Sequence, residues 1–354
     1  MNNLAYCELG NIKSDLKVYK KERRTGSFRS KREERRYWIL LIVLIALGIL
    51  FSYGLLVYNN PVPVNSPSFI PVVKRRMVAL GAMVIAAICQ SLATIAFQSS
   101  TNNRIITPSL LGFEALYSTI HTATMFFGGA GAFLEFSGTG SFLFQIVAMV
   151  VMCLILYGWL LTGKYGNLQL MLLIGVIFGT GLKSLSSFMR RLLAPSEFDI
   201  LQAKLFGSVN NADPDYFPIA IPIVLITSIL LLANSKKLNV ISLGQNTSIP
   251  LGVNHKGGVI YTLILVSILM SITTALVGPL TFYGFLVATM TYQAAPTYDH
   301  RYLFPMGLAI GFLVITGAYF FMYHVFNAQG VVSVIIEMFG GLVFLIVMLR
   351  KGSL

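Results

Sequence analysis

Four histidines are the side chains in this sequence best suited to hold a metal ion or to move a proton. They are His121, His255, His300 and His324. Zinc sites gather histidines with cysteines or carboxylates at short spacings, and these four do not cluster with carboxylates in that way. The pattern therefore predicts no metal site and no catalytic cluster, and we expect neither an enzyme nor a bound cofactor.

A glycine-rich stretch at residues 175–184 has some features of a phosphate-binding loop. Its spacing departs from G-x-x-x-x-G-K-[ST], and no strand precedes it, although nucleotide-binding loops follow a strand. Glycines within apolar segments more commonly allow two helices to pack closely. We therefore expect no nucleotide on this chain. Any step that ATP drives would require another subunit.

The composition is that of a membrane protein. Of the 354 residues, 56% are hydrophobic and 11% are charged, whereas soluble domains carry about 25% charged residues. Ten apolar runs of helical length predict an all-α polytopic membrane protein with about ten transmembrane helices. The runs are 37–58, 74–99, 109–127, 142–162, 167–188, 218–234, 258–278, 281–294, 303–325 and 331–349.

The net charge of +13 is unevenly distributed. Eleven of the 26 basic residues lie in residues 1–36, directly before the first apolar run. Basic residues beside a span mark the cytoplasmic side, so this distribution indicates a lipid bilayer and not nucleic acid as the partner. With residues 1–36 as a cytoplasmic tail, ten crossings bring Arg350 and Lys351 back to the inside, and both termini are expected in the cytoplasm.

Two basic clusters fall on the predicted outer side, against this rule. Lys74, Arg75 and Arg76 open the second span, and Arg190 and Arg191 follow the fifth. Since topology does not require charges at these places, a binding role is one interpretation, and contact with lipid phosphates is the other. The moderately apolar segment 192–217, which follows the second cluster, is expected to form a surface helix and loop on the outer face.

A polar segment at residues 97–117 separates the second and third spans. It contains Gln98, Asn103, Pro108 and Gly112 at a spacing that resembles the turn after the second membrane helix of permeases importing iron chelates and vitamin B12, the FecCD type. The variant T-N-N-R-I-x-T-P is similar to the ferric-siderophore branch, with its petrobactin- and catecholate-type systems. Segments 184–198, 275–287 and 299–305 also resemble this family, so the likeness covers about residues 37–352.

The resemblance implies a type II ABC importer permease fold over residues 37–352, in a bacterial cytoplasmic membrane. It implies a second permease, either different or identical, a pair of cytoplasmic ABC ATPases, an extracytoplasmic siderophore-binding protein and a ferric siderophore as cargo. Such a permease performs no bond chemistry, since the ATPase subunits hydrolyse ATP. The path through it is expected to use uncharged polar side chains near the second span: Gln98, Thr101, Asn102 and Asn103.

The cytoplasmic stretch 238–256 is too polar to cross a membrane. It is similar to the Leu-Gly, six residues, Leu-Gly-Val segment that forms coupling helices against the ATPase in this family. The residues that match or lie between are Leu243, Gly244, Gln245, Ser248, Leu251 and Gly252. An ordinary amphipathic loop is the alternative, and Pro250 stands where the family has a residue compatible with a helix.

The resemblance also implies roles for the outer basic clusters. Arg75 and Arg76 are similar to family arginines that pair with glutamates of the binding protein, and Arg190 and Arg191 are further candidates. A competing function is a secondary transporter driven by an ion gradient. That class of protein would share the spans, but it would need a network of charges inside the membrane and no coupling loop.

Overall fold

The computed structural model describes residues 26–58, 67, 69–136, 138–162, 168–325 and 332–351. The described part is helical throughout and contains no strand, which confirms the predicted all-α fold. The ten helices that correspond to the ten predicted spans are α2 (Lys31–Val57), α3 (Phe69–Ser100), α4 (Phe113–Glu135), α5 (Thr139–Thr162), α6 (Leu168–Arg191), α8 (Phe217–Ala233), α11 (His255–Val277), α12 (Tyr283–Ala294), α13 (His300–His324) and α14 (Val332–Lys351).

Shorter elements connect these helices. They are the helices α7 (Pro195–Leu205), α9 (Ser235–Ile241) and α10 (Gln245–Ser248), and the 3-10 turns η1 (Pro108–Leu111), η2 (Val209–Asn211) and η3 (Pro214–Tyr216). α7, η2 and η3 occupy the expected outer segment 192–217. The 11 residues of α7 extend about 17 Å at ~1.5 Å each, which is too short to cross a hydrocarbon core of about 30 Å.

Seven described helices are long and apolar enough to cross a membrane: α2, α3, α5, α6, α8, α11 and α13. The other three helices that match predicted spans, α4, α12 and α14, are not long or apolar enough to meet this criterion. α4 carries Glu114 and His121 and is interrupted at Gly129, where φ is +70°. α12 has 12 residues, and the described apolar stretch of α14 is limited to Val332–Val343.

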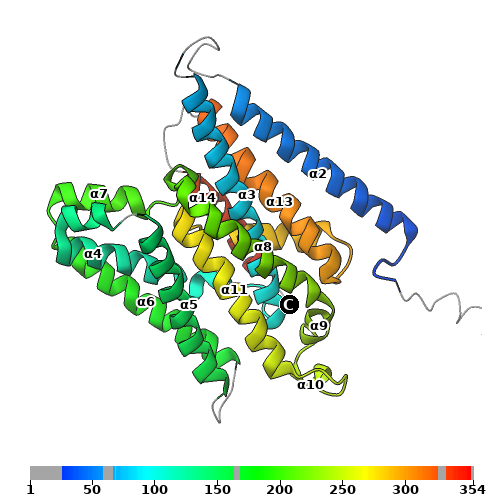
Figure 1. Cartoon of the computed structure of the whole chain (residues 1–354). Coiled ribbons are helices and arrows are strands. Elements are labelled where there is room, and N and C mark those ends of the chain that lie inside the picture. Colours follow the sequence, from blue (N-terminus) through cyan, green and yellow to red (C-terminus); the bar gives the residue numbers. More distant parts are fainter. Residues whose placement is uncertain are drawn as a thin grey trace, which may run out of the picture.

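Three helices form the centre of the bundle. In the most apolar part of α3, α11 and α13, 67%, 78% and 61% of the residues are buried. In Figure 1, α3 and α11 run through the middle, α2 lies outermost beside α13, and α4, α6 and α7 lie on the opposite side. Small residues allow the close packing: a Cβ on Gly311 of α13 would collide with the Ser91 hydroxyl of α3.

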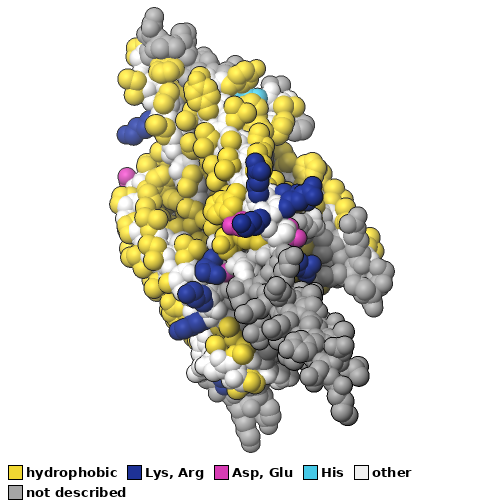
Figure 2. Space-filling model, turned by 90° about the vertical axis from the view of Figure 1, so that its right-hand side faces the viewer, with side chains coloured by type: hydrophobic (Ala, Val, Ile, Leu, Met, Phe, Trp, Pro, Cys, Tyr) yellow, Lys and Arg dark blue, Asp and Glu magenta, His cyan; other side chains and the backbone are white. Residues whose placement is uncertain are grey.

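The outer surface of α2 is apolar. Ile42 is 63% exposed and Leu50 is 61% exposed, as expected for a helix whose surroundings are lipid. Figure 2 shows hydrophobic side chains over much of this face of the molecule, with most of the Lys and Arg side chains gathered in the middle and lower part of the view.

The first helix begins earlier than the apolar pattern predicts. The Ser30 side chain accepts a hydrogen bond from the Glu33 N–H at 3.2 Å and caps α2, so the helix starts at Lys31 and not at residue 37. A serine or threonine in this position satisfies one of the free amides of the first turn. The last residues of the predicted tail 1–36 are therefore helical, and residues 1–25 lie outside the described part of the chain.

Candidate functional site

The polar turn after α3 uses several of its side chains to hold its own shape. The Gln98 amide donates to the backbone oxygen of Arg104 at 2.8 Å, and the Thr101 hydroxyl donates to a carbonyl of α3 at 2.9 Å. The Asn103 side-chain oxygen accepts from the backbone N–H two residues further on, also at 2.9 Å. Gln98 and Thr101 are buried. The assignment of these residues to the transport path stays a prediction.

Asn102 differs from its neighbours because its side chain is exposed. Its φ is +50°, a left-handed conformation that asparagine tolerates better than most residues. A Cβ built on Gly244 would lie 3.7 Å from the Asn102 side-chain nitrogen. The turn after the second span and the predicted coupling loop are therefore neighbours in space, although about 140 residues separate them in the sequence.

The predicted coupling loop, residues 238–256, consists of α9, α10 and two sharp turns. Gly244 and Gly252 occupy those turns with φ values of +89° and +76°, a region that favours glycine. α10 ends at Ser248, directly before Ile249 and Pro250, as expected where a proline stands in place of a residue compatible with a helix. Ser248 is buried, and its hydroxyl lies 2.9 Å from His255 Nδ1. The loop is thus fixed to the start of α11.

The same loop exposes apolar side chains. Leu243 is 55% exposed, Ile249 is 55% exposed and Leu251 is 58% exposed. Apolar groups clustered on a short, rigid loop outside the spans are typical of a surface that a partner protein covers. We refer to Leu243, Ile249 and Leu251 as the loop patch. Gln245 is exposed beside it, whereas the side chain of Ser248 points inward.

A chain of hydrogen bonds connects this loop to the ends of two central helices. The Asn239 side chain of α9 donates to the Asp299 carboxylate at 2.9 Å and accepts from the backbone N–H of His300 at 2.9 Å. The His300 ring lies 2.6 Å from the Ser99 hydroxyl at the end of α3. We call Ser99, Asn239, Asp299 and His300 the base network. It joins α9, α3 and the first turn of α13.

The bonding partners orient the His300 ring. The Asn239 amide nitrogen faces a carboxylate, so its oxygen must face His300, and that oxygen accepts from Nδ1–H at 2.5 Å. His300 Nε2 is then free to accept the hydroxyl hydrogen of Ser99. A neutral ring with one donor and one acceptor is compatible with both contacts.

Asp299 gathers three donors. Arg301 forms an ion pair with it at 2.7 Å, and the Ser27 hydroxyl donates at 2.8 Å. Partial burial alone raises the pKa of the Asp299 carboxyl. The hydrogen bonds from Arg301, Asn239 and Ser27 outweigh that effect and hold the pKa well below its usual range. The carboxylate therefore keeps its charge, and its contacts, throughout the physiological pH range.

The end of the basic tail also packs on the base network. Besides the Ser27 bond to Asp299, the Phe28 ring lies 4.8 Å from the Tyr302 ring and 5.4 Å from the Tyr37 ring, centroid to centroid. The Tyr37 hydroxyl donates to the backbone oxygen of Tyr302 at 2.9 Å. Ser27 and Phe28 are consequently held against the start of α13, on the same side as the coupling loop.

The four candidate docking arginines fall into two groups. Arg76 is partly buried and donates to the backbone oxygens of Leu55 and Leu56 at 3.1 and 3.0 Å, at the end of α2. Arg190 contacts its own helix at 3.4 Å. Arg75 and Arg191 are exposed. A docking role stays a prediction for all four, and the geometry favours Arg75 and Arg191 because Arg76 already caps a helix.

Two carboxylates inside the bundle share one hydroxyl. Thr281 donates to Glu114 at 2.7 Å and lies 3.4 Å from Glu337, so the start of α4, the link before α12 and α14 meet at this point. The contact explains how Glu114 is accommodated among apolar helices. In the described residues, no three His, Cys, Asp or Glu side chains form a group that could hold a metal ion.

The described helices form a membrane bundle, and a compact loop with exposed apolar side chains lies at one end of it. This architecture is that of a membrane permease. The chain belongs to the FecCD transport family, whose family model matches residues 39–350. It is similar to the petrobactin import system permease protein FatC of Bacillus anthracis, with 68% identity over 354 residues and 100% of both chains covered. It is an ABC importer permease and not an enzyme.

Two further comparisons agree. The petrobactin import system permease protein YclO of Bacillus subtilis (strain 168) is 34% identical over 314 residues, which cover 89% of this chain and 96% of that one. A solved structure, described as an inward-facing conformation of a metal-chelate type ABC transporter, matches with a TM-score of 0.73 at 17% identity. It covers 89% of this chain and 99% of the other. At that identity the match supports the fold.

Sequence reasoning identified the loop but missed how it is anchored. The segment 299–305 resembles a family signature, but the resemblance gives it no role, and the sequence pattern does not distinguish Ser99 and Asn239 from other polar residues. Polar residues at the ends of apolar runs were the available signal, since they border the membrane. The sequence does not predict which of these polar residues bond to each other, because His300 and Ser99 are 201 positions apart. Ile249 was also missed as part of the loop patch.

Proposed function

We propose that this chain is one permease subunit of an ATP-driven importer for ferric siderophores, and that petrobactin is the first cargo to test. The observation that carries the proposal is the 68% identity with a petrobactin import permease along the full length of both chains. The 34% identity to a second petrobactin permease supports the same cargo class.

The proposed assembly has a second permease, two cytoplasmic ABC ATPases and an extracytoplasmic siderophore-binding protein. The loop patch supports an ATPase partner, because three exposed apolar side chains on one cytoplasmic loop would gain stability from being covered. The exposed cations Arg75 and Arg191 support an acidic partner on the other side, since complementary charge speeds docking. Both termini then lie in the cytoplasm, together with the loop.

The permease would work by alternating access. ATP binding and hydrolysis move the ATPases, and the loop must transmit that motion without deforming. The base network gives it the required stiffness, because Asn239 ties α9 to α13 through Asp299 and His300. The Ser99 contact extends the tie to α3. In this account, Gln98, Thr101, Asn102 and Asn103 border the cytoplasmic exit of the path at the end of α3.

The proposal is tested by uptake in cells. A deletion strain and its complemented twin are given radiolabelled ferric siderophores one at a time, at equal iron concentration. We expect complementation to restore uptake of ferric petrobactin at least tenfold above the deletion strain. An ATPase-deficient partner subunit should abolish that uptake, whereas dissipating the ion gradient with ATP held constant should not. The opposite pattern would support the gradient-driven transporter and refute the proposal.

A further inference from the structure

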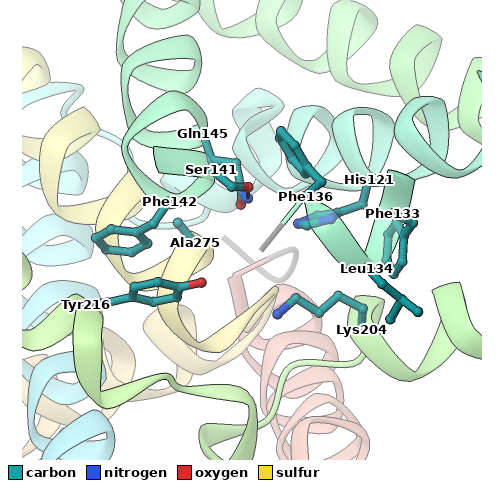
Figure 3. A pocket seen from close by; sticks show the side chains of 10 residues that line it. All are labelled: His121, Phe133, Leu134, Phe136, Ser141, Phe142, Gln145, Lys204, Tyr216 and Ala275. Atoms are coloured by element: carbon teal, nitrogen blue, oxygen red, sulfur yellow. Dashed lines mark hydrogen bonds between the residues drawn. The ribbon is translucent and has the colours of Figure 1, made fainter. Parts of the chain in front are cut away.

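A second polar site lies apart from the base network, at the junction of α4, α5 and α7. A cavity of about 130 Å³ opens there between aromatic side chains and a group of polar ones. Figure 3 shows the polar ends of Lys204 and Tyr216 directed into the space from one side and those of His121, Ser141 and Gln145 from the other. Phe133, Phe136 and Phe142 form apolar walls.

Buried polar atoms in this cavity lack partners among the described residues. His121 is 2% exposed, and neither of its ring nitrogens makes a hydrogen bond of full geometry to a described residue, although the Gln145 side chain lies close enough to interact with the ring. The Gln145 side chain donates to the Ser141 hydroxyl at 3.0 Å, which leaves the Gln145 oxygen unpartnered. A buried polar group without a partner is destabilising, so a polar ligand that fills the cavity would be favoured.

The available groups are mainly donors. The Ser141 oxygen already accepts from Gln145, and the Tyr216 oxygen accepts from the Gly138 N–H at 3.0 Å, so each hydroxyl can direct its own hydrogen into the cavity. Lys204 adds an ammonium, and His121 adds a ring N–H. A donor-rich pocket with a cation matches an oxyanion, because carboxylate and phosphate oxygens accept hydrogen bonds and carry the opposite charge.

Lys204 has no fixed counter-ion in the described chain. Asp213 is near enough to favour its charged form, but no carboxylate forms an ion pair with it within 4.0 Å among the described residues. Partial burial lowers the pKa of Lys204, and the charge on Asp213 opposes that shift. An anion in the cavity would supply the missing partner at close range.

We propose that the cavity lined by His121, Ser141, Gln145, Lys204 and Tyr216 binds one small oxyanion, a carboxylate or a phosphate group. Its volume corresponds to about four water molecules at ~30 Å³ each, which suits one such group and excludes a bulky chelate. The bound group would tie α7, on the outer segment, to α4 and α5. Two sources share this chemistry: a free anion, and the phosphate of a lipid headgroup.

Thermal unfolding of the purified full-length permease tests the free anion. Acetate and phosphate are titrated separately at constant ionic strength. We expect a saturable rise of about 2–4 °C in the midpoint, and its loss in Lys204→Gln. Lys74→Gln is the matched control, since Lys74 is an exposed lysine away from the cavity, and it should keep the rise. His121→Phe preserves the ring packing and should also lose it.

Native mass spectrometry tests the lipid source. If the anion is a lipid headgroup, wild-type permease purified from membranes that contain phosphatidylglycerol should retain one anionic lipid and no phosphatidylcholine. The Lys204→Gln variant should lose the bound lipid, and the Lys74→Gln variant should keep it. Either the anion shift or the retained lipid, lost only in the cavity variants, supports the site. The site is refuted if the wild-type protein shows neither effect, or if Lys204→Gln and Lys74→Gln behave alike. Both measurements on the wild-type protein remain decisive even if a variant fails to fold.

Discussion

The Nε2 atom of His300 lies 2.6 Å from the Oγ atom of Ser99, and this contact joins the first turn of α13 to the last turn of α3. His300 is also held by Asn239 of α9. Two of the most buried helices of the bundle are therefore linked at the base of the coupling loop. Displacement of α9 by a partner would be passed directly to both of them.

The first prediction concerns Asn239. Asn239→Ala removes the donor to Asp299 and the acceptor for His300, and each unpaired group costs about 1–3 kcal/mol. We expect a lower thermal midpoint and at least a fivefold loss of chelate uptake, with basal ATP hydrolysis retained. Asn246→Ala is the control, because Asn246 is an exposed asparagine of α10 outside the base network. Equal uptake by the two variants would show that the network does not transmit force.

The second prediction concerns the loop patch. Leu251→Asp places a carboxylate where we propose an apolar contact with the ATPase, and burying an unpaired charge costs several kcal/mol. Membrane insertion should be normal, while ATPase co-purification and chelate-stimulated ATP hydrolysis should fall together by about tenfold. Gly244→Asp is a poorer test because φ is +89° at that position, so strain would add to any loss of contact.

The control for the loop patch is Leu192→Asp. Leu192 is 59% exposed, as Leu251 nearly is, but it follows α6 on the opposite side of the spans. The Leu192→Asp variant should leave ATPase co-purification unchanged. If Leu251→Asp retains its ATPase and its transport as well as Leu192→Asp does, the loop patch is not the coupling surface.

The third prediction concerns docking on the outer side. Arg75→Glu should weaken association with the binding protein, with most of the effect in the association rate and with a reduced salt dependence. Basal ATP hydrolysis should be unaffected. Lys256→Glu, at an exposed cation beside the coupling loop, is the charge-matched control. Unchanged affinity and salt dependence in Arg75→Glu would assign this arginine to the lipid boundary.

Arg76 requires a separate experiment. Its guanidinium caps the end of α2 through the carbonyls of Leu55 and Leu56, so Arg76→Glu should lower the thermal midpoint whether or not a binding protein is present. A double variant, Arg75→Glu with Arg76→Glu, would combine the loss of docking with the loss of helix capping. Single variants separate a folding role from a docking role.

The fourth prediction is a pH dependence. The folded pKa of Asp299 is depressed, so its contacts stabilise the protein above the ordinary carboxyl pKa of about 4. That contribution is lost as the pH falls toward the folded value. Asp299→Asn should therefore lower the thermal midpoint at pH 7, and the difference from the wild-type protein should shrink below about pH 4. A difference that stays constant from pH 7 to pH 3 would exclude an electrostatic origin.

The sequence was sufficient to predict the helices and the loop, because lipid leaves a long apolar run few alternatives to a helix. The start of α2 at Lys31 could have been predicted from the sequence, because Ser30 followed by Glu33 three positions later is a helix-capping pattern. The length of α12 was harder to predict, since the apolar run alone does not reveal that only 12 residues are helical.

The contacts of the candidate site were not predictable from spacing. Arg75 and Arg76 are adjacent and chemically identical, yet one is exposed and the other caps α2. That difference depends on where the end of α2 lies relative to α3, which is a property of the tertiary packing. The same holds for Gln98, whose amide is occupied by a backbone oxygen of its own turn.

The most direct measurement of the central claim is uptake of ⁵⁵Fe-labelled ferric petrobactin by the deletion strain carrying either the wild-type permease or Leu251→Asp, at matched membrane levels of the two proteins. We expect the wild-type chain to restore ATP-dependent uptake and Leu251→Asp to restore less than about a tenth of it. Full uptake with both chains would contradict the coupling role of the loop, and no uptake of any ferric siderophore with the wild-type chain would contradict the proposed function itself.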